Sequence, residues 1–242
     1  MMGTRMGDHG TRHYVLVSGS WHGGWVWHEV AARLRAAGHE VSTPTLTGLG
    51  ERRHLGQGAD LALHVEDIVT HIEMERQSGV TLVGWSYGGM VTTGVLARIP
   101  ETIRAMIYLD AFVPEDGKAL VDYLTPEGRA AWDKFKDADA PLPPLSAERL
   151  GLTDPAQIES VVPRLTAQAW QSFYQPVRAL KQRPAIPTAY IKCTGNPAPH
   201  FKTILEAMKR DQAVRTDAIA TGHCCMVTEP AETARMLETY GA

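Results

Sequence analysis

A serine between two glycines is the first feature of this sequence that has the spacing of a chemical site. Ser86 lies in the pentapeptide GWSYG at 84–88, between a β-rich run at 79–84 and a helical pattern at 87–98. Glycines at these positions relieve the crowding of a strand that reverses sharply into a helix. The turn then holds the hydroxyl at its tip. A serine beside glycine is also a common turn residue, so the strand–turn–helix context carries the prediction of a nucleophile.

A serine hydroxyl is a poor nucleophile at neutral pH, so it needs a general base within hydrogen-bond reach. Among the ten histidines, His223 is our candidate base. It follows the last strand-like run in the stretch ATGHCCM and precedes the final helical pattern. A base at this place completes the chain order serine, acid, histidine. The sequence therefore predicts acyl transfer.

Two backbone amides are candidates for stabilising the charge that develops on the attacked oxygen. The turn directs the Tyr87 N–H to a helix start, where unpaired amides and the helix dipole favour negative charge. The Gly-rich loop SGSWHGGW at 18–25 follows the first strand-like run, and we assign the Ser20 N–H to the same oxyanion hole. His22 in this loop either shapes the pocket or packs. The loop lacks the GxGxxG spacing of a dinucleotide site, so we expect no such cofactor.

The elements that must position these residues alternate between short β-rich runs and longer helical patterns. This alternation is typical of an α/β fold with a mostly parallel central sheet flanked by helices. The β-rich runs are 13–19, 39–46, 79–84, 103–110, 187–193 and 213–220, and the helical patterns are 25–38, 60–77, 87–98, 199–210 and 230–240. We predict a core at 13–113 and 187–242, a helical cap at 114–186, and a disordered leader at 1–12.

The proposed cap breaks the alternation with helical fragments and many prolines, and it is too long for an ordinary connection. Its aromatic residues either pack the segment onto the sheet or line a pocket beneath a lid. Trp132 and Trp170 in the cap, with Trp21 and Trp85 beside the motifs, are our candidate substrate-binding residues. Their rings predict a small, largely apolar or aromatic substrate.

Composition and charge argue against other classes of partner. The 242 residues carry a formal net charge of −3 without a basic block, so nothing indicates nucleic acid or an anionic membrane. No run approaches the roughly 18 apolar residues of a membrane span. The three cysteines, Cys193, Cys224 and Cys225, have neither disulfide nor metal-ligand spacing. We expect a cytoplasmic monomer or homodimer that binds a small molecule and uses no cofactor and no metal.

Three stretches together resemble the α/β-hydrolase superfamily, namely SGSWHGGW, GWSYGGM and GHCCMVTEP. The resemblance is nearest to the branch of small bacterial esterases, plant methyl esterases and plant hydroxynitrile lyases. Supporting stretches are PTLTGLGERRHL at 44–55, YLDAFVPEDG at 108–117 and RLTAQAWQSFYQPV at 164–177. The resemblance covers nearly the whole chain from residue 13. It implies an α/β-hydrolase fold with the cap inserted after the strand that ends at Asp110.

The sequence departs from this family pattern at two places. The first-strand motif usually begins with His-Gly, whereas this chain has Ser18 followed by Gly19, a change that leaves the Ser20 amide in place. Relatives take the acid that orients histidine from a CTxD stretch, whereas this chain has Asn196 there, which is a candidate substitute without charge. Asp110 is our candidate acid, because other α/β-hydrolases supply the acid from that strand end. A bracing role at the entry to the cap is its alternative.

The residues and the resemblance imply a serine esterase or carbamate hydrolase, in the class of carboxylic ester hydrolases. Ser86 would form an acyl-enzyme with His223 as general base, and water would release the acid. Plant hydroxynitrile lyases have a lysine directly after the histidine, and Cys224 stands there instead. The alternative is a non-hydrolytic enzyme of this fold, a lyase or cyclising enzyme that uses His223 as base. A binding protein without turnover is the third possibility.

Overall fold

Six parallel strands form the central sheet of the protein. The structure is a computed structural model that describes residues 10–56 and 58–241. The strand order is β2-β1-β3-β4-β5-β6, with every neighbouring pair parallel. The strands are β1 (His13–Val17), β2 (Glu40–Ser42), β3 (Val80–Trp85), β4 (Ile103–Leu109), β5 (Thr188–Cys193) and β6 (Val214–Ile219). The order reverses between β1 and β3, and ligands of such sheets bind beside the carboxyl ends of the strands at this reversal.

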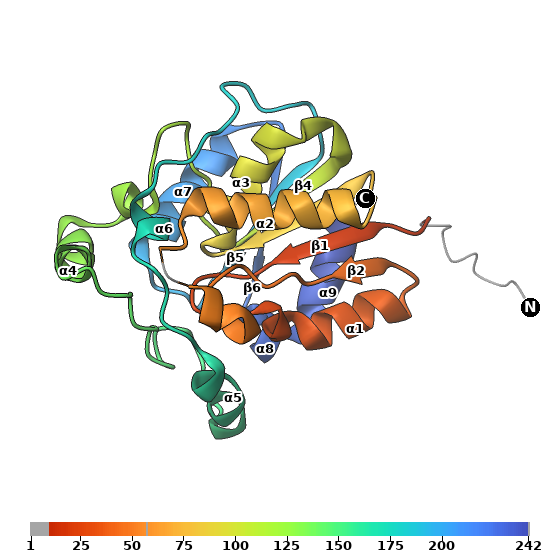
Figure 1. Cartoon of the computed structure of the whole chain (residues 1–242). Helices are drawn as coiled ribbons and strands as arrows, with labels where there is room; N and C mark the ends of the chain where they lie inside the picture. Colours follow the sequence, from red (N-terminus) through yellow and green to blue (C-terminus); the bar gives the residue numbers. More distant parts are fainter. Residues whose placement is uncertain (1–9, 57, 242) are drawn as a thin grey trace, which may run out of the picture.

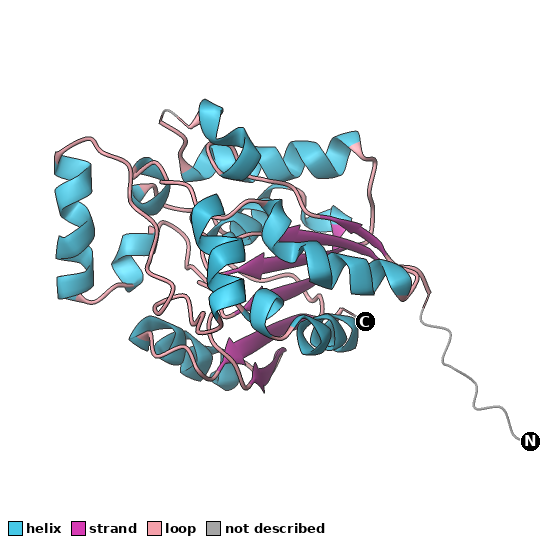
Figure 2. Ribbon diagram, turned by 90° about the horizontal axis from the view of Figure 1, so that it is seen from below, coloured by secondary structure: helices cyan, strands magenta, loops and turns pink. Residues whose placement is uncertain are grey.

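Helices cover both faces of the sheet (Figures 1 and 2). One face carries α1 (His28–Ala36), α8 (Cys225–Thr228) and α9 (Pro230–Tyr240), and the other carries α2 (Leu61–Met74), α3 (Gly88–Arg98) and α7 (Pro199–Arg210). Successive strand residues point to opposite faces. Leu82 and its neighbour Val83 accordingly belong to the two different core clusters. Both faces of the sheet are therefore buried, which explains the continuous apolar runs in the sequence.

The chain between β4 and β5 supplies a set of short helices at one end of the sheet. These are η4 (Leu120–Tyr123), α4 (Pro126–Asp137), α5 (Pro155–Val161), η5 (Val162–Arg164) and α6 (Gln171–Tyr174). In Figure 1, α4, α5 and α6 lie beyond the end of the sheet toward which β1 points. This is the end that carries the predicted site.

The predicted α/β architecture is confirmed, with differences at the ends of elements. The strand expected at 39–46 is limited to Glu40–Ser42, and the helix expected at 25–38 begins with a 3-10 turn, η1 (Gly24–Trp27). Of the leader expected at 1–12, residues 1–9 lie outside the described part of the chain. Arg12 is not part of a disordered leader: it is 5% exposed and donates to the Glu238 carbonyl at 2.7 Å. This bond fastens the start of β1 to the last helix.

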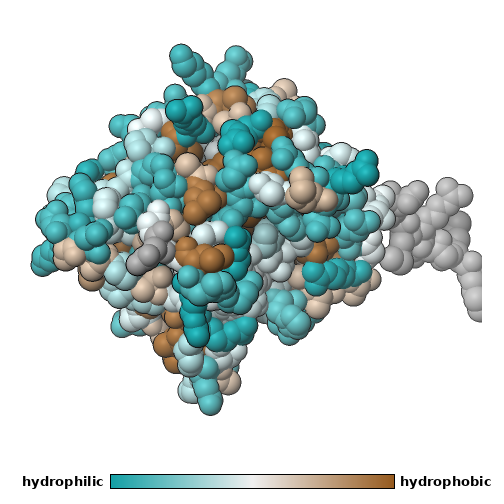
Figure 3. Space-filling model, in the orientation of Figure 1, coloured by the Kyte–Doolittle hydropathy of each residue, from teal (hydrophilic) through white to brown (hydrophobic). Residues whose placement is uncertain are grey.

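The surface is mostly polar, with hydrophobic residues in small separate patches on the face shown in Figure 3. Large exposed hydrophobic residues come from well-separated places in the chain: Leu55, Leu63, Met74, Val162 and Leu180. Of the helices formed by residues 10–56 and 58–241, none has both the length and the apolar character that crossing a membrane requires.

Candidate active site

Ser86 occupies a strained turn between β3 and α3. Its φ is 55°, in the left-handed region that non-glycine residues seldom adopt. A Cβ on Gly84 would lie 2.5 Å from Thr92 Oγ1, and a Cβ on Gly88 would lie 2.6 Å from the Val17 carbonyl oxygen. Both glycines of the motif are therefore needed because α3 starts so close to β1 and β3. The structure thus has the strand–turn–helix geometry expected around a nucleophilic serine.

His223 and Asp110 lie in contact beside this serine, although they come from distant parts of the chain. Nδ1 of His223 lies 2.7 Å from Oδ2 of Asp110, and the His223 ring lines the same pocket as Ser86. Asp110 is fully buried just after β4, with a φ of 43°. Since Nδ1 is engaged by the carboxylate, Nε2 is the nitrogen available to the serine. This geometry supports the acid role of Asp110 rather than a bracing role alone.

Asn196 contacts the same pair, but as a donor to the carboxylate. Its Nδ2 donates to Oδ2 of Asp110 at 2.6 Å, and its Oδ1 accepts from the Ala198 N–H at 3.1 Å. Nδ2 also lies 3.0 Å from Nδ1 of His223. Two donors cannot bond each other, so Nδ1 gives its proton to Asp110. This geometry favours a role for Asn196 in holding the acid Asp110. It does not favour Asn196 as a substitute for the acid, which the sequence had suggested as a candidate role.

Lys192 completes the surroundings of Asp110, and sequence reasoning missed it. The residue is 7% exposed, and its ammonium nitrogen lies 2.8 Å from Oδ1 of Asp110. Burial acts to raise the pKa of Asp110, but the hydrogen bond and charge of His223 and the charge of Lys192 lower it overall. Asp110 is thus held as a carboxylate. A lysine in the otherwise apolar run TAYIKC was the available signal, because a buried lysine needs a partner.

The two candidate oxyanion amides lie on either side of the serine. Tyr87 directly follows Ser86 and forms the N-cap of α3. The first-strand loop approaches the serine so closely that a Cβ on Gly19 would lie 2.8 Å from Cβ of Ser86, and Ser20 lines the pocket. Ser18, which replaces the usual histidine, donates to the Gly23 carbonyl at 3.0 Å and so closes the loop internally. The positions of both amides support the oxyanion assignment.

A pocket of about 340 Å³ opens onto these groups. Its walls are mostly aromatic and apolar, and they include Trp21, Phe112, Leu120, Leu124, Trp132, Leu145, Phe173 and Phe201. Trp132 lies 6.0 Å from Trp21 and 5.9 Å from Phe173 between ring centroids. Two of the four predicted substrate-binding tryptophans, Trp21 and Trp132, therefore lie where a substrate on Ser86 would contact them.

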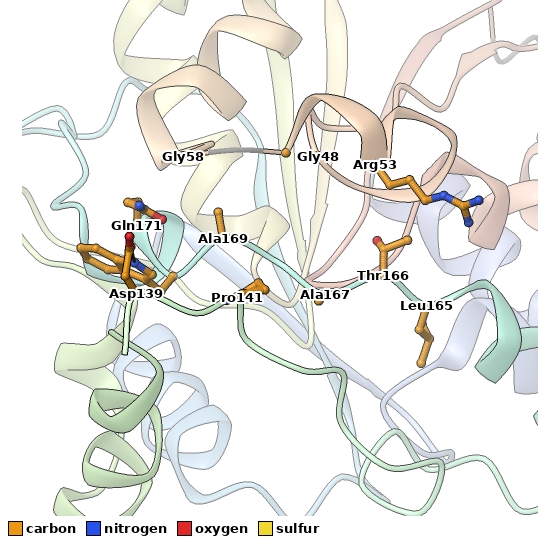
Figure 4. Close-up of a pocket in the computed structure, with 12 residues that line it drawn as sticks. Gly48, Arg53, Gly58, Asp139, Pro141, Leu165, Thr166, Ala167, Ala169 and Gln171 are labelled. Carbon is orange, nitrogen blue, oxygen red and sulfur yellow. Dashed lines mark hydrogen bonds between the residues drawn. The ribbon is translucent and has the colours of Figure 1, made fainter. Parts of the chain in front are cut away.

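The structure does not bring Trp85 and Trp170 to this pocket. Trp85 is 1% exposed and supports His223 from behind, because its indole N–H donates to the His223 carbonyl at 2.9 Å. Trp170 lines a separate open groove of about 770 Å³ (Figure 4). Its indole N–H donates to Asp139 at 2.8 Å. Trp85 was selected for its place in the serine motif and Trp170 for its place in the cap. Tertiary packing directs the first into the core behind His223 and the second into the open groove.

Two further histidines of the site are held neutral. Burial lowers the pKa of His22 to about 4, and burial together with the nearby His223 lowers the pKa of His200 to about 4. His200 lines the pocket and stacks on Phe112 at 5.1 Å between ring centroids. These rings therefore carry no charge at neutral pH. Burial also raises the pKa of the Cys224 thiol well above its ordinary value, which disfavours it as a nucleophile.

Comparisons with known proteins agree with this architecture. A family model described as "Alpha/beta hydrolase family" matches residues 14–236. The chain is 38% identical to a carbendazim hydrolyzing esterase from Nocardioides sp. (strain SG-4G), over 95% of this chain and 99% of that protein. It is 34% identical to methylesterase 10 from Arabidopsis thaliana, over 49% of this chain and 46% of that protein. A solved extracellular alpha/beta-hydrolase from a Paenibacillus species covers 95% of this chain and 99% of its own, with 24% identity and a TM-score of 0.84, which supports the fold.

Proposed function

The chain belongs to the alpha/beta hydrolase family, and from this premise we propose that it is a serine esterase acting on a small aromatic ester or carbamate. The observation that carries this proposal is the 2.7 Å contact between Oδ2 of the buried Asp110 and Nδ1 of His223, whose ring lines the same pocket as Ser86. A carboxylate on this nitrogen stabilises the imidazolium that forms when histidine takes the serine proton. The site thus has the parts that acyl transfer requires.

The proposed reaction has two halves. In the first, Nε2 of His223 takes the proton of Ser86 Oγ as that oxygen attacks the substrate carbonyl carbon. The Ser20 and Tyr87 N–H groups donate to the resulting oxyanion, and His223 then gives its proton to the leaving group. In the second half, water attacks the acyl-enzyme with His223 again as base, and Ser86 recovers its proton.

The substrate class is inferred from the pocket and from the relatives. The aromatic walls formed by residues such as Trp21, Trp132 and Phe173 favour a flat, apolar group beside the reacting carbonyl. The full-length relative from Nocardioides is named for the hydrolysis of carbendazim, which supports a small ester-like or carbamate substrate for this chain. The lyase or cyclising alternative has less support, because Asp110 supplies the charge that Asn196 lacks.

We also propose a cytoplasmic setting and a small molecule as the partner. Cys193, Cys224 and Cys225 are free and buried, as suits a protein kept under reducing conditions. Cell fractionation and sizing of the purified protein would test the setting and distinguish a monomer from a homodimer.

Labelling with a fluorophosphonate and hydrolysis of p-nitrophenyl acetate and aryl methyl carbamates test the function. We expect wild type to be labelled and to turn over, and Ser86→Ala to lose both at unchanged fold. Ser160→Ala, an exposed serine in α5, is the matched control and should behave as wild type. Turnover of an ester that survives Ser86→Ala would contradict the proposal and favour base catalysis by His223 without an acyl-enzyme.

A further inference from the structure

The loop that carries the Ser20 amide contains a strained residue. Trp21 has a φ of 66°, which is left-handed backbone for a bulky side chain. This conformation is unfavourable for an L-residue, so it persists where neighbouring contacts hold it in place. The Ser20–Trp21 peptide contains the Ser20 carbonyl and the Trp21 N–H, and Cα of Ser20 joins it to the preceding peptide, which contains the Ser20 N–H. A relaxation of the strain that moves Cα of Ser20 would move this N–H with it. The assigned oxyanion donor therefore depends on whatever keeps this peptide in place.

His22 holds the carbonyl end of this peptide. Its Nδ1 lies 2.7 Å from the Ser20 carbonyl oxygen, and its ring is fully buried. A carbonyl oxygen accepts but does not donate, so the proton of this neutral imidazole lies on Nδ1. Nε2 of His22 has no hydrogen-bond partner in the described part of the chain. Burial of the imidazole therefore leaves Nε2 without a partner, while Nδ1 donates a hydrogen bond to the Ser20 carbonyl.

Gln168 holds the amide end of the same peptide from the opposite side. Its Oε1 accepts from the Trp21 N–H at 3.0 Å, and the residue is 1% exposed. Its Nε2 donates to Ser172 Oγ at 2.8 Å, and that hydroxyl donates to the Ala169 carbonyl at 2.7 Å. Only one orientation of the Gln168 carboxamide allows both hydrogen bonds. The bond from Nε2 to Ser172 therefore fixes Oε1 toward the Trp21 N–H.

Two more bonds from the same cap fasten the residue that follows Ser20. The Thr166 N–H donates to the Trp21 carbonyl at 3.0 Å, and the Trp21 indole N–H donates to the Leu142 carbonyl at 3.1 Å. Leu142 and Gln168 are themselves joined by a pair of backbone bonds. Contacts with the cap, in addition to the connection to the sheet, therefore hold the strained turn at Trp21 in place.

We propose that Gln168 and His22 are positioning residues of the oxyanion hole, which clamp the Ser20–Trp21 peptide and thereby fix Cα of Ser20, so that the N–H of this residue stays in place toward the reacting carbonyl. The inference rests on the proposed function. It assigns the cap a part in stabilising the transition state, in addition to lining the pocket. Neither residue touches the substrate in this role, since both act through the peptide they hold.

Gln168→Met tests the cap side of the clamp, because it keeps the side-chain length and removes the acceptor. Loss of a whole oxyanion donor costs about 10²–10³ in rate, so a misplaced donor should lower kcat by about 10- to 100-fold. We expect KM to change less than about threefold, because the donor acts mainly on the transition state. Affinity for a trifluoromethyl ketone, which forms an oxyanion on Ser86, should fall in parallel with kcat/KM, while affinity for the product acid stays unchanged.

Gln171→Met is the matched control. It makes the same chemical change three residues later, at a side chain that lines the open groove in Figure 4. We expect its kcat, KM and inhibitor affinity to equal those of wild type. A folded Gln168→Met protein with wild-type kcat, or with a loss confined to KM, overturns the proposal.

Variants at His22 test the other end, and they decide the question even if Gln168→Met fails to fold. His22→Phe removes the donor to Ser20, whereas His22→Asn keeps an N–H close to the place of Nδ1. We expect a loss of kcat in the first and a partial recovery in the second. Equal kcat in these two variants contradicts the clamp. Because both ends hold one peptide, the double variant Gln168→Met with His22→Phe should lose less than the product of the single losses.

Failure of this inference differs from failure of the proposed function. If the function is wrong, wild type shows no turnover that depends on Ser86. If the function is right and the clamp is wrong, wild type and Ser86→Ala differ as expected, while the Gln168 and His22 variants match wild type.

Discussion

Four donors surround the buried carboxylate of Asp110. Their arrangement distinguishes the role of Asp110 from that of Asn196. His223 and Asn196 contact Oδ2, whereas the Lys192 ammonium and the Cys193 N–H contact Oδ1. A buried carboxylate with this many partners remains charged and fixed in direction. We therefore propose that Asp110, just after β4, supplies the charge that stabilises an imidazolium, and that Asn196 contributes hydrogen bonding without charge.

Replacement of the acid should therefore cost far more than replacement of its support. Asp110→Asn removes the charge beside His223, and the corresponding change in a serine protease lowers kcat by about 10⁴-fold. We expect a loss approaching that size for Asp110→Asn and about 10-fold for Asn196→Ala, which removes one of several donors. Steady-state kinetics on p-nitrophenyl acetate, with circular dichroism as the check on folding, measures both. A larger loss for Asn196→Ala than for Asp110→Asn would transfer the acid role away from Asp110.

At the scale of elements, the site depends on how closely α3 approaches the sheet. A Cβ on Gly89 would lie 2.0 Å from the Phe112 carbonyl oxygen, which belongs to the chain just after β4. Gly94 is also in α3, but a Cβ there would lie 2.5 Å from Cγ2 of Val65, a side-chain methyl rather than a backbone atom. Backbone cannot yield as a side-chain methyl can. The first turn of α3 therefore has the stricter requirement for glycine.

Alanine substitution at these two glycines should differ in its effect on stability. Overpacking typically costs about 1–3 kcal/mol and can cost more, while alanine in a helix gains about 1 kcal/mol over glycine. We expect Gly89→Ala to lower the free energy of unfolding by about 3 kcal/mol or more and to disturb Ser86, and Gly94→Ala to change it by about 1 kcal/mol or less. Urea unfolding followed by circular dichroism gives both values. Equal stability of the two variants would mean that α3 can shift away from Phe112.

The two candidate tryptophans of the cap line different hollows, Trp132 the pocket with Ser86 and Trp170 the open groove. Substitution of each should therefore have a different effect on KM. Trp132→Ala removes a wall of the pocket that holds Ser86 and should raise KM for aryl substrates by about 10-fold or more, in keeping with the area that a tryptophan buries. Trp170→Ala alters the open groove instead and should leave KM within about twofold. Michaelis–Menten kinetics on a series of aryl and alkyl esters distinguishes them. A matching rise in KM for Trp170→Ala would place the substrate partly in that groove.

At the scale of the whole molecule, several histidines are uncharged because they are fully buried, as His22 and His64 are, or partly buried, as His200 is. Burial lowers the pKa of His22 and of His200 to about 4, and it also lowers the pKa of His64. The unfolded chain binds protons at these rings near the ordinary value of 6.5, so it holds more protons than the folded chain in the interval below. Folding therefore becomes less favourable as the pH falls from about 6.5 toward 4.

Acid should accordingly destabilise the protein well before its carboxylates titrate. We expect the melting temperature to be constant above about pH 7 and to fall steadily between about pH 6.5 and 4, with a further fall at lower pH as Asp110 takes up a proton. His200→Phe should flatten the fall between pH 6.5 and 4, whereas His28→Gln, at an exposed position, should not. Differential scanning calorimetry across this range supplies the curves. A melting temperature that stays constant down to pH 4.5 would contradict neutral burial of these rings.

The sequence by itself determined the features that arise from local geometry and hydrophobic periodicity. The alternation of buried strands and amphipathic helices indicated the α/β fold, and the glycines around Ser86 indicated the turn, because backbone crowding is a property of neighbours in the chain. The position of His223 followed from its place after the last strand. These predictions needed no knowledge of which strands pair.

Tertiary structure alone decided which side chains meet. Asp110 and Asn196 both follow strands, and whether His223 contacts one or the other depends on the register in which β4 and β5 pair, with Leu109 opposite Ile191. The placing of Lys192 on that carboxylate, of Gln168 on the Trp21 amide, and of Trp170 away from Ser86 likewise depends on contacts between residues far apart in sequence. Residue spacing carries no information on such contacts, because the packing of the cap and sheet sets them.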